Sequence, residues 1–160
     1  MNLSKAGARA VASVVGMSTD SNKRLVQRMY DDFNHGRFDD LANVIGADYV
    51  AADGNRGPDA FAAIIGRLRT AFPDITYTLD DLVADGDRVA ARWTWRGTFS
   101  GQFRDISPTG KRVVNSGMAI FRVADGKIVA STMENDRLGF LIATGKIAYE
   151  PSFGPPPRAD

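Results

Sequence analysis

The amino-acid sequence predicts a single α+β domain, in which helices come first and an antiparallel sheet follows. Up to Pro73 the apolar residues recur at intervals of three and four, which is the period of an amphipathic helix. After Pro73 they alternate with polar residues, which is the period of a half-buried strand. Asp-Gly turns separate the later strand segments and favour hairpins between neighbours. Helices followed by hairpin-connected strands are typical of a strand meander packed on helices.

The length of 160 residues, with 44% hydrophobic residues, suits one compact core. We expect an N-terminal extension over residues 1–19, the folded domain over 20–146 and an extended proline-rich tail over 147–160. Lys5 and Arg9 precede a short alanine-rich stretch that only weakly imitates a signal peptide. We therefore expect a cytoplasmic protein.

Composition limits the partners and cofactors. The formal charge of +1 gives no electrostatic reason to expect nucleic acid or an acidic membrane surface. No apolar run approaches the roughly 20 residues that span a bilayer. The chain has no cysteine and one histidine, which excludes thiolate and multi-histidine metal sites. The sequence thus favours a small molecule or a second copy of the chain as partner.

Two long amphipathic helices are predicted in the first half of the chain. Asp20 or Ser21 can cap the first, and Gly36 suits the left-handed position after it. Pro58 lies near the start of the second, and Pro73 ends it. Their apolar stripes are Leu25, Val26, Met29, Tyr30 and Phe33, and Phe61, Ile64, Ile65, Leu68 and Phe72. Each stripe must be buried against another layer.

Shorter elements complete the prediction. A short helix is expected over residues 39–45 and a short strand over 48–52, followed by a turn at Asp53. The alternating strand segments cover residues 75–79, 88–99, 111–123 and 127–135. A closing hydrophobic segment follows the last strand.

The strand over residues 88–99 has two different faces. One face carries Val89, Ala91, Trp93 and Trp95, and the other carries Ala90, Arg92, Thr94 and Arg96. On an antiparallel sheet a charged face is ordinarily solvated. The alternative is that the polar face lines a pocket, and the alternation alone does not decide between the two.

No strong catalytic motif is present, so the candidate chemistry comes from isolated residues. Asp136 ends an alternating strand just before an apolar segment, where a carboxylate could be half desolvated and act as an acid or base. It could equally be the N-cap of a closing helix. Asp53 is a second candidate carboxylate, or an ordinary turn aspartate. Asn115 and Arg92 could assist, the arginine by stabilising an enolate or oxyanion.

The order and spacing of several motifs resemble the SnoaL-like polyketide cyclase family, within the nuclear-transport-factor-two-like superfamily. The motifs are RLVQRMYDDFNHGRFDDL, RGPDAF, RGTFSG, SPTGKRVV, DGKI and NDRLGFLIATG, and together they cover about residues 20 to 145. The resemblance implies a cone-shaped, strongly curved antiparallel sheet with helices packed over it and an internal apolar pocket. It also implies homodimers through the outer face of the sheet.

The resemblance also implies a set of pocket residues. The side chains expected to look into the pocket are Arg92, Thr94, Arg96, Asn115, Gly117 and Ala119. Trp93 and Trp95 are expected to face the other way. Phe33 and Ile64 match positions that line the cyclase pocket, and Tyr30 is expected to contact the substrate with them. The carboxylate that is catalytic in the family lies six residues beyond the DGKI lysine, where this chain has Met133.

The chemistry implied by the resemblance is an intramolecular aldol cyclisation of a small hydrophobic substrate, an aromatic polyketide ester, that needs no metal and no cofactor. A carboxylate removes an acidified proton, and the same group returns a proton to the new alkoxide. Met133 cannot transfer protons, so Asp136 is the expected acid/base here. A non-catalytic ligand-binding cone is the main alternative. Isomerisation, dehydration or epoxide hydrolysis in the same fold is another, although Thr94 replaces an aspartate of the epoxide-hydrolase arrangement.

Overall fold

The computed structural model describes residues 18–50 and 54–154 of the chain. The order of helices and strands along the chain is α1 (Thr19–His35), η1 (Asp39–Asn43), α2 (Gly57–Ala71), β1 (Thr76–Asp85), β2 (Arg88–Thr98), β3 (Arg112–Ala124), β4 (Lys127–Asn135), α3 (Arg137–Ala143) and η2 (Pro151–Phe153). The predicted α+β class, with helices before an antiparallel meander, is confirmed.

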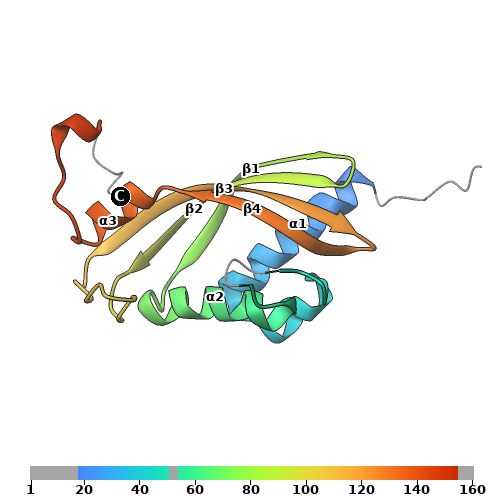
Figure 1. Ribbon diagram of the computed structural model, residues 1–160, viewed down its shortest axis with the longest axis horizontal. Coiled ribbons are helices and arrows are strands. Elements are labelled where there is room, and N and C mark those ends of the chain that lie inside the picture. Colours follow the sequence, from blue (N-terminus) through green and yellow to red (C-terminus); the bar gives the residue numbers. More distant parts are fainter. Residues whose placement is uncertain (1–17, 51–53, 155–160) are drawn as a thin grey trace, which may run out of the picture.

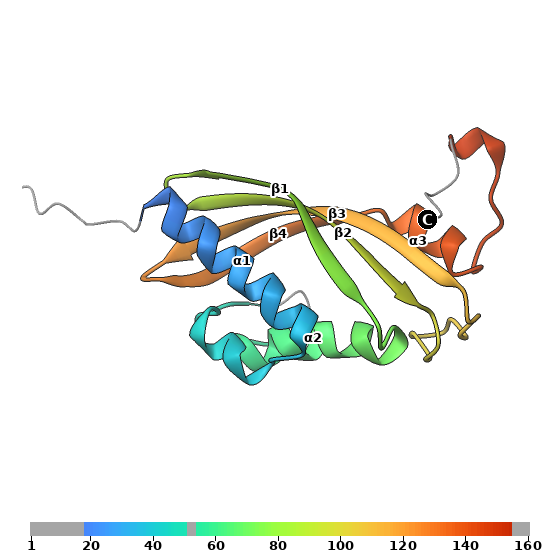
Figure 2. The same cartoon turned by 180° about the vertical axis from the view of Figure 1, so that it is seen from behind.

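The four strands form one antiparallel sheet in the order β1-β2-β3-β4, so each strand pairs with its neighbour in sequence. The sheet is strongly curved, and α1 and α2 lie on one side of it (Figure 1). The opposite view in Figure 2 shows the same arrangement, with α3 at the far end of the sheet. We call the side toward α1 and α2 the inner face and the other side the outer face.

The ends of α1 follow from local hydrogen bonding. Its N-cap is Ser18, whose Oγ accepts a hydrogen bond from Ser21 N at 3.2 Å, so the predicted caps Asp20 and Ser21 lie inside the first turn. Gly36 ends the helix as predicted, with φ of 67°. Asp20 lies in the first turn of α1, where an acidic side chain is stabilised by the helix dipole.

Some predicted boundaries differ from the structure. The predicted short helix is a 3-10 helix over Asp39–Asn43, and Val44 and Ile45 continue as buried chain beyond it. Strand β1 runs six residues past Leu79, to Asp85, because a bulge between Leu79 and Asp81 lets its pairing with β2 continue. The predicted strand over 48–52 leaves only a bridge between Val50 and Arg56 among the described residues.

The core lies between the inner face and the helices. Val26, Met29 and Phe33 of α1 are buried against it, which matches the predicted helix stripe. On β2 the buried residues are Val89, Ala91, Trp93, Trp95 and Gly97. The expectation that Trp93 and Trp95 face outward was therefore wrong.

No helix within residues 18–50 and 54–154 is long and apolar enough to cross a membrane.

Candidate functional site

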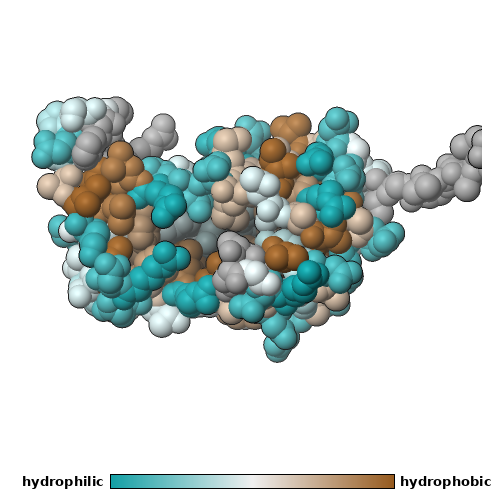
Figure 3. All heavy atoms as spheres, viewed as in Figure 1, coloured by the Kyte–Doolittle hydropathy of each residue, from teal (hydrophilic) through white to brown (hydrophobic). Residues whose placement is uncertain are grey.

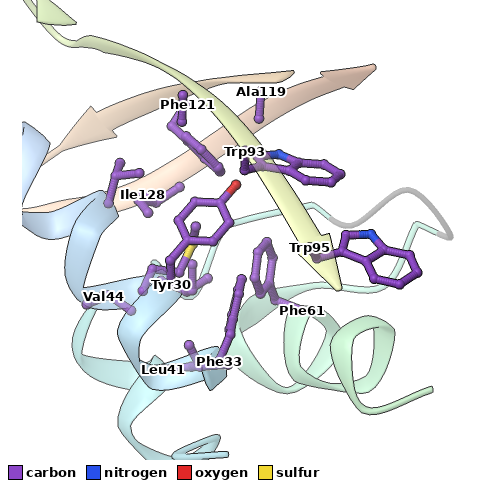
Figure 4. Close-up of a cluster of buried hydrophobic side chains, with 14 of the residues drawn as sticks. Tyr30, Phe33, Leu41, Val44, Phe61, Trp93, Trp95, Ala119, Phe121 and Ile128 are labelled. Carbon is purple, nitrogen blue, oxygen red and sulfur yellow. The ribbon is translucent and has the colours of Figure 1, made fainter. Parts of the chain in front are cut away.

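The inner face carries a connected group of aromatic rings between the sheet and α1 and α2. The ring centroids of Tyr77 and Trp93 are 5.7 Å apart, and those of Tyr30 and Tyr77 are also 5.7 Å apart. Phe33 stacks on Phe61 at 5.5 Å. Figure 4 shows Tyr30, Phe33 and Phe61 projecting from the helices toward the strand that carries Trp93. These rings belong to the hydrophobic core or pack against it.

Three polar groups lie within this aromatic cluster. Trp93 exposes only 4% of its surface, and its Nε1 has no hydrogen-bond partner in the described part of the chain. In Figure 4 the hydroxyl of Tyr30 points toward Trp93. Burial raises the pKa of Tyr30, with a further contribution from nearby Tyr77, and burial also raises the pKa of Tyr77. Both hydroxyls therefore stay protonated and can donate hydrogen bonds.

Local contacts hold these rings in place. The side-chain amide of Asn34 donates to Tyr77 O at 2.9 Å, and its Oδ1 accepts from Tyr77 N at 2.7 Å, which ties β1 to α1. Trp93 lies opposite Gly117 in the β2–β3 pairing. A Cβ at Gly117 would come within 2.4 Å of Trp93 Cζ2, so only glycine leaves room for the indole.

A second polar group on the inner face joins a loop to β4. The hydroxyls of Tyr49 and Ser131 are 2.8 Å apart. Burial raises the pKa of Tyr49, and the hydrogen bond to Ser131 partly opposes this. Ser131 lies opposite Phe121 in the β3–β4 pairing and two residues before Met133, so it shares the inner face with both.

Asp136 and Asn115 lie close together where β4 ends. Asn115 is buried on the inner face, and its Nδ2 donates to the backbone carbonyl of Asp136 at 2.7 Å. The Asp136 side chain is exposed and caps α3, with Oδ1 accepting from Gly139 N at 2.7 Å. In the structure Asp136 is therefore the N-cap of α3, which was the alternative interpretation of this residue.

The edge of the inner face along β4 is open. Met133 is 41% exposed and pairs with Ala119, which is buried on the inner face. Asn135 is also exposed and pairs with Gly117. The surface drawn in Figure 3 is hollowed between β4 and α2. We call this edge, formed by Met133, Asn135 and Gly117, the mouth of the inner face.

Three predicted pocket residues lie on the outer face instead. Arg92 Nη1 is 3.3 Å from Asp80 Oδ2, and Thr94 Oγ1 donates to the same oxygen at 2.7 Å. Arg96 lines a surface pocket of about 250 Å³ with Asp74, Thr76, Thr78, Gly97 and Arg112. The expectation that these three side chains look into the inner pocket was wrong, because β2 buries its tryptophan face against the helices.

The remaining predicted residues are distributed as follows. Phe33 and Tyr30 of α1 are buried in the aromatic cluster, and Ile64 of α2 packs against the core. Asn115, Gly117, Ala119 and Met133 share the inner face. Asp53 lies outside the described residues.

Sequence reasoning missed Trp93, Tyr77, Tyr49 and Ser131 as residues of the inner face. For Trp93 the available signal was Gly117 on the neighbouring strand. A glycine leaves room for a large ring opposite it, so the ring and the glycine are expected to share one face of the sheet. The hydrogen bond between Tyr49 and Ser131 joins residues far apart in the chain, and no local pattern predicts it. Across residues 18–50 and 54–154, no group of three or more histidine, aspartate or glutamate side chains is arranged to hold a metal ion.

A curved antiparallel sheet over helices, with an aromatic inner face and an open edge, defines a cone-type α+β protein. The family model described as SnoaL-like polyketide cyclase matches residues 24–143. This chain belongs to the SnoaL-like polyketide cyclase family.

Individual relatives agree with this assignment. Aklanonic acid methyl ester cyclase DauD of Streptomyces sp. (strain C5) is 32% identical over 146 residues, covering 84% of this chain and 90% of that protein. Aklanonic acid methyl ester cyclase DnrD of Streptomyces peucetius is 32% identical over 111 residues, covering 65% and 77%. The solved structure of TsrD from Streptomyces laurentii has a TM-score of 0.77 and 28% identity, covering 82% of this chain and 99% of that one.

Proposed function

We propose that this chain is an enzyme that closes a ring in a hydrophobic, ring-containing polyketide ester by acid/base chemistry and without a cofactor. The observation that carries the proposal is its similarity to DauD, a methyl ester cyclase, along most of both chains. The aromatic inner face supports it, because stacked and edge-on rings favour a flat aromatic ligand.

The proposed reaction is an intramolecular aldol addition. A carboxylate takes a proton from a carbon that lies between electron-withdrawing carbonyl groups, which leaves an enolate. The enolate carbon then forms a bond to a ketone carbon of the same molecule, and the resulting alkoxide takes a proton back from the carboxylic acid. The conjugated substrate carries the negative charge between these two steps.

Asp136 is the proposed acid/base. It directly follows Asn135 of the mouth, and Asn115 holds its backbone carbonyl from the inner face. One carboxylate oxygen binds Gly139 N, and the carboxylate has a second oxygen for proton transfer. Arg92 has no part in this proposal, since its side chain lies on the outer face beside Asp80.

Asp136→Asn tests the assignment without removing the helix cap, because asparagine caps helices about as well as aspartate. With aklanonic acid methyl ester as substrate, Asp136→Asn should lower kcat by at least 100-fold, the usual range of general acid/base contributions being about 10²–10⁴. Glu134→Gln is the matched control, since Glu134 pairs with outer-face Met118 on the same strand. Unchanged turnover by Asp136→Asn would remove Asp136 from the mechanism.

A ligand-binding protein without catalysis is the second candidate, and Met133 is the observation that favours it. Met133 occupies the inner-face position where the family resemblance implies the catalytic carboxylate. The discriminating variant is Met133→Asp, which the exposed position can accommodate. If the wild-type chain binds aklanonic acid methyl ester without turnover and Met133→Asp acquires turnover, the binding function holds. Turnover by the wild-type chain supports the enzyme.

A further inference from the structure

We infer that Trp93, Tyr30 and Tyr77 form a subsite for an uncharged carbonyl oxygen of the ligand, such as that of a ring ketone or quinone. The first observation is the indole N–H of Trp93, which is buried and has no acceptor among residues 18–50 and 54–154. Buried N–H groups in folded proteins almost always have a partner, so this donor indicates an acceptor other than the residues that the structure describes.

The neighbours of this N–H are also donors. The Tyr30 hydroxyl points toward Trp93 (Figure 4), and a tyrosine hydroxyl can donate a hydrogen bond. The ring centroids of Tyr30 and Tyr77 are 5.7 Å apart, so the two side chains are neighbours in the aromatic cluster. A carbonyl oxygen has two lone pairs and can accept from two of these donors at once.

The surroundings select for a neutral oxygen. The rings packed on Tyr30 and Tyr77 are those of Phe33, Phe121 and Trp93, which are all uncharged. An anion placed there would lose its hydration without meeting a cation, which is far less favourable than burying a hydrogen-bonded carbonyl. The subsite is therefore expected to bind ketones or quinones in preference to carboxylates or phosphates.

The indole edge lies next to the mouth. In the indole ring, Nε1 and Cζ2 are both bonded to Cε2, and Cζ2 is the atom that faces Gly117. Gly117 pairs with the exposed Asn135, so the N–H edge is close to the open side of the sheet. A ring that enters past Met133 can bring an oxygen to this edge without crossing the helix layer.

This inference rests on ligand binding by the inner face, as in the proposed function, but not on catalysis. The probes are 1-tetralone, a neutral ring ketone, and tetralin, the same ring system without the oxygen. The chain has two tryptophans, so a proton–nitrogen NMR spectrum of the full-length protein contains two indole N–H signals. Trp95→Phe assigns them, since Trp95 packs on Phe72 and Phe140 in a separate aromatic group.

The expected result is that 1-tetralone moves the Trp93 indole proton downfield and leaves the Trp95 signal in place, whereas tetralin has no comparable effect. Trp93→Phe should weaken 1-tetralone binding about 3- to 10-fold and tetralin binding by less, since one neutral hydrogen bond is lost. If Trp93→Phe does not fold, Tyr30→Phe and Tyr77→Phe remove single hydroxyls and should have the same selective effect.

The subsite is overturned if the Trp93 signal does not respond to 1-tetralone, or if tetralin moves it equally. A response to 1-tetralone in a protein that does not convert aklanonic acid methyl ester would leave the subsite intact and remove the cyclase. Turnover of that ester with no Trp93 response to 1-tetralone would support the cyclase and remove the subsite.

Discussion

Gly117→Ala should destabilise the protein, because the added methyl group has no room beside Trp93. The new Cβ would lie 2.4 Å from Trp93 Cζ2, 2.7 Å from Cη2 and 2.6 Å from the carbonyl oxygen of Glu134. Carbon atoms in contact are about 3.5–4.0 Å apart, so the overlap with the indole is roughly 1 Å. Both the indole and the backbone of β4 would have to move.

Overpacking of this kind ordinarily costs about 1–3 kcal/mol. The loss of glycine's backbone freedom in the unfolded chain returns about 0.4–1 kcal/mol. We therefore expect the free energy of unfolding to fall by about 1–2 kcal/mol. For a urea dependence of about 1–3 kcal/mol per molar, the midpoint of urea unfolding should fall by on the order of 1 M.

Gly66→Ala in α2 is the matched control, since a Cβ there meets nothing within 4 Å. It should raise the free energy of unfolding by about 0.5–1 kcal/mol, as alanine is preferred in a helix. In a Trp93→Phe background, Gly117→Ala should be less harmful because the phenyl ring is shorter than the indole. An unchanged midpoint for Gly117→Ala, or strict additivity in the double variant, would refute the packing described for Trp93.

Three further outcomes are expected. Asp136→Ala should lower the free energy of unfolding by about 1 kcal/mol in urea titrations and Asp136→Asn by much less, and equal losses would contradict a capping role. Hydrogen bonds from Thr98 N and Oγ1 lower the pKa of Asp74, so the stability they contribute is present above the unfolded pKa and is lost as the pH falls through the lower folded pKa. Asp74→Asn should therefore flatten the decline in Tm below about pH 4. An unchanged decline would contradict this role of Asp74. We propose a homodimer through the outer face, where Met118 and Ile120 are about half exposed. Ile120→Glu should shift the mass measured by light scattering toward the 17.3 kDa of one chain. A monomeric wild-type protein would refute the proposed dimer.

The fold was predictable from sequence because its signals are local. The change of period at Pro73 separates helices from strands, and Asp125-Gly126 fixes the hairpin between β3 and β4. The bulge near Asp80 was not predictable in the same way. It depends on how β1 follows the curvature of β2, and no residue in β1 is a strong local signal for a bulge.

The faces of the sheet were harder to assign than its strands. An alternating strand has two faces by construction, and alternation does not say which one is covered. The family resemblance led to the choice of the arginine face of β2, whereas the structure buries the tryptophan face. A tryptophan side chain buries about 150–250 Å², and at about 25 cal/mol per Å² each one favours the covered face by roughly 4–6 kcal/mol. This energetic argument alone would have corrected the assignment.

Met133, which stands where the family resemblance implies the catalytic carboxylate, restricts how the proposed chemistry can proceed. Met133 lies within β4 on the inner face, whereas Asp136 follows the strand and is turned toward the first turn of α3. A carboxylate at Asp136 must therefore act at the mouth rather than inside the aromatic cluster. A substrate that gives a carbonyl oxygen to Trp93 would then present its acidic carbon beyond Gly117 and Asn135, which requires separate positions on an extended ring system. The proposed enzyme should consequently prefer fused multi-ring substrates to single rings.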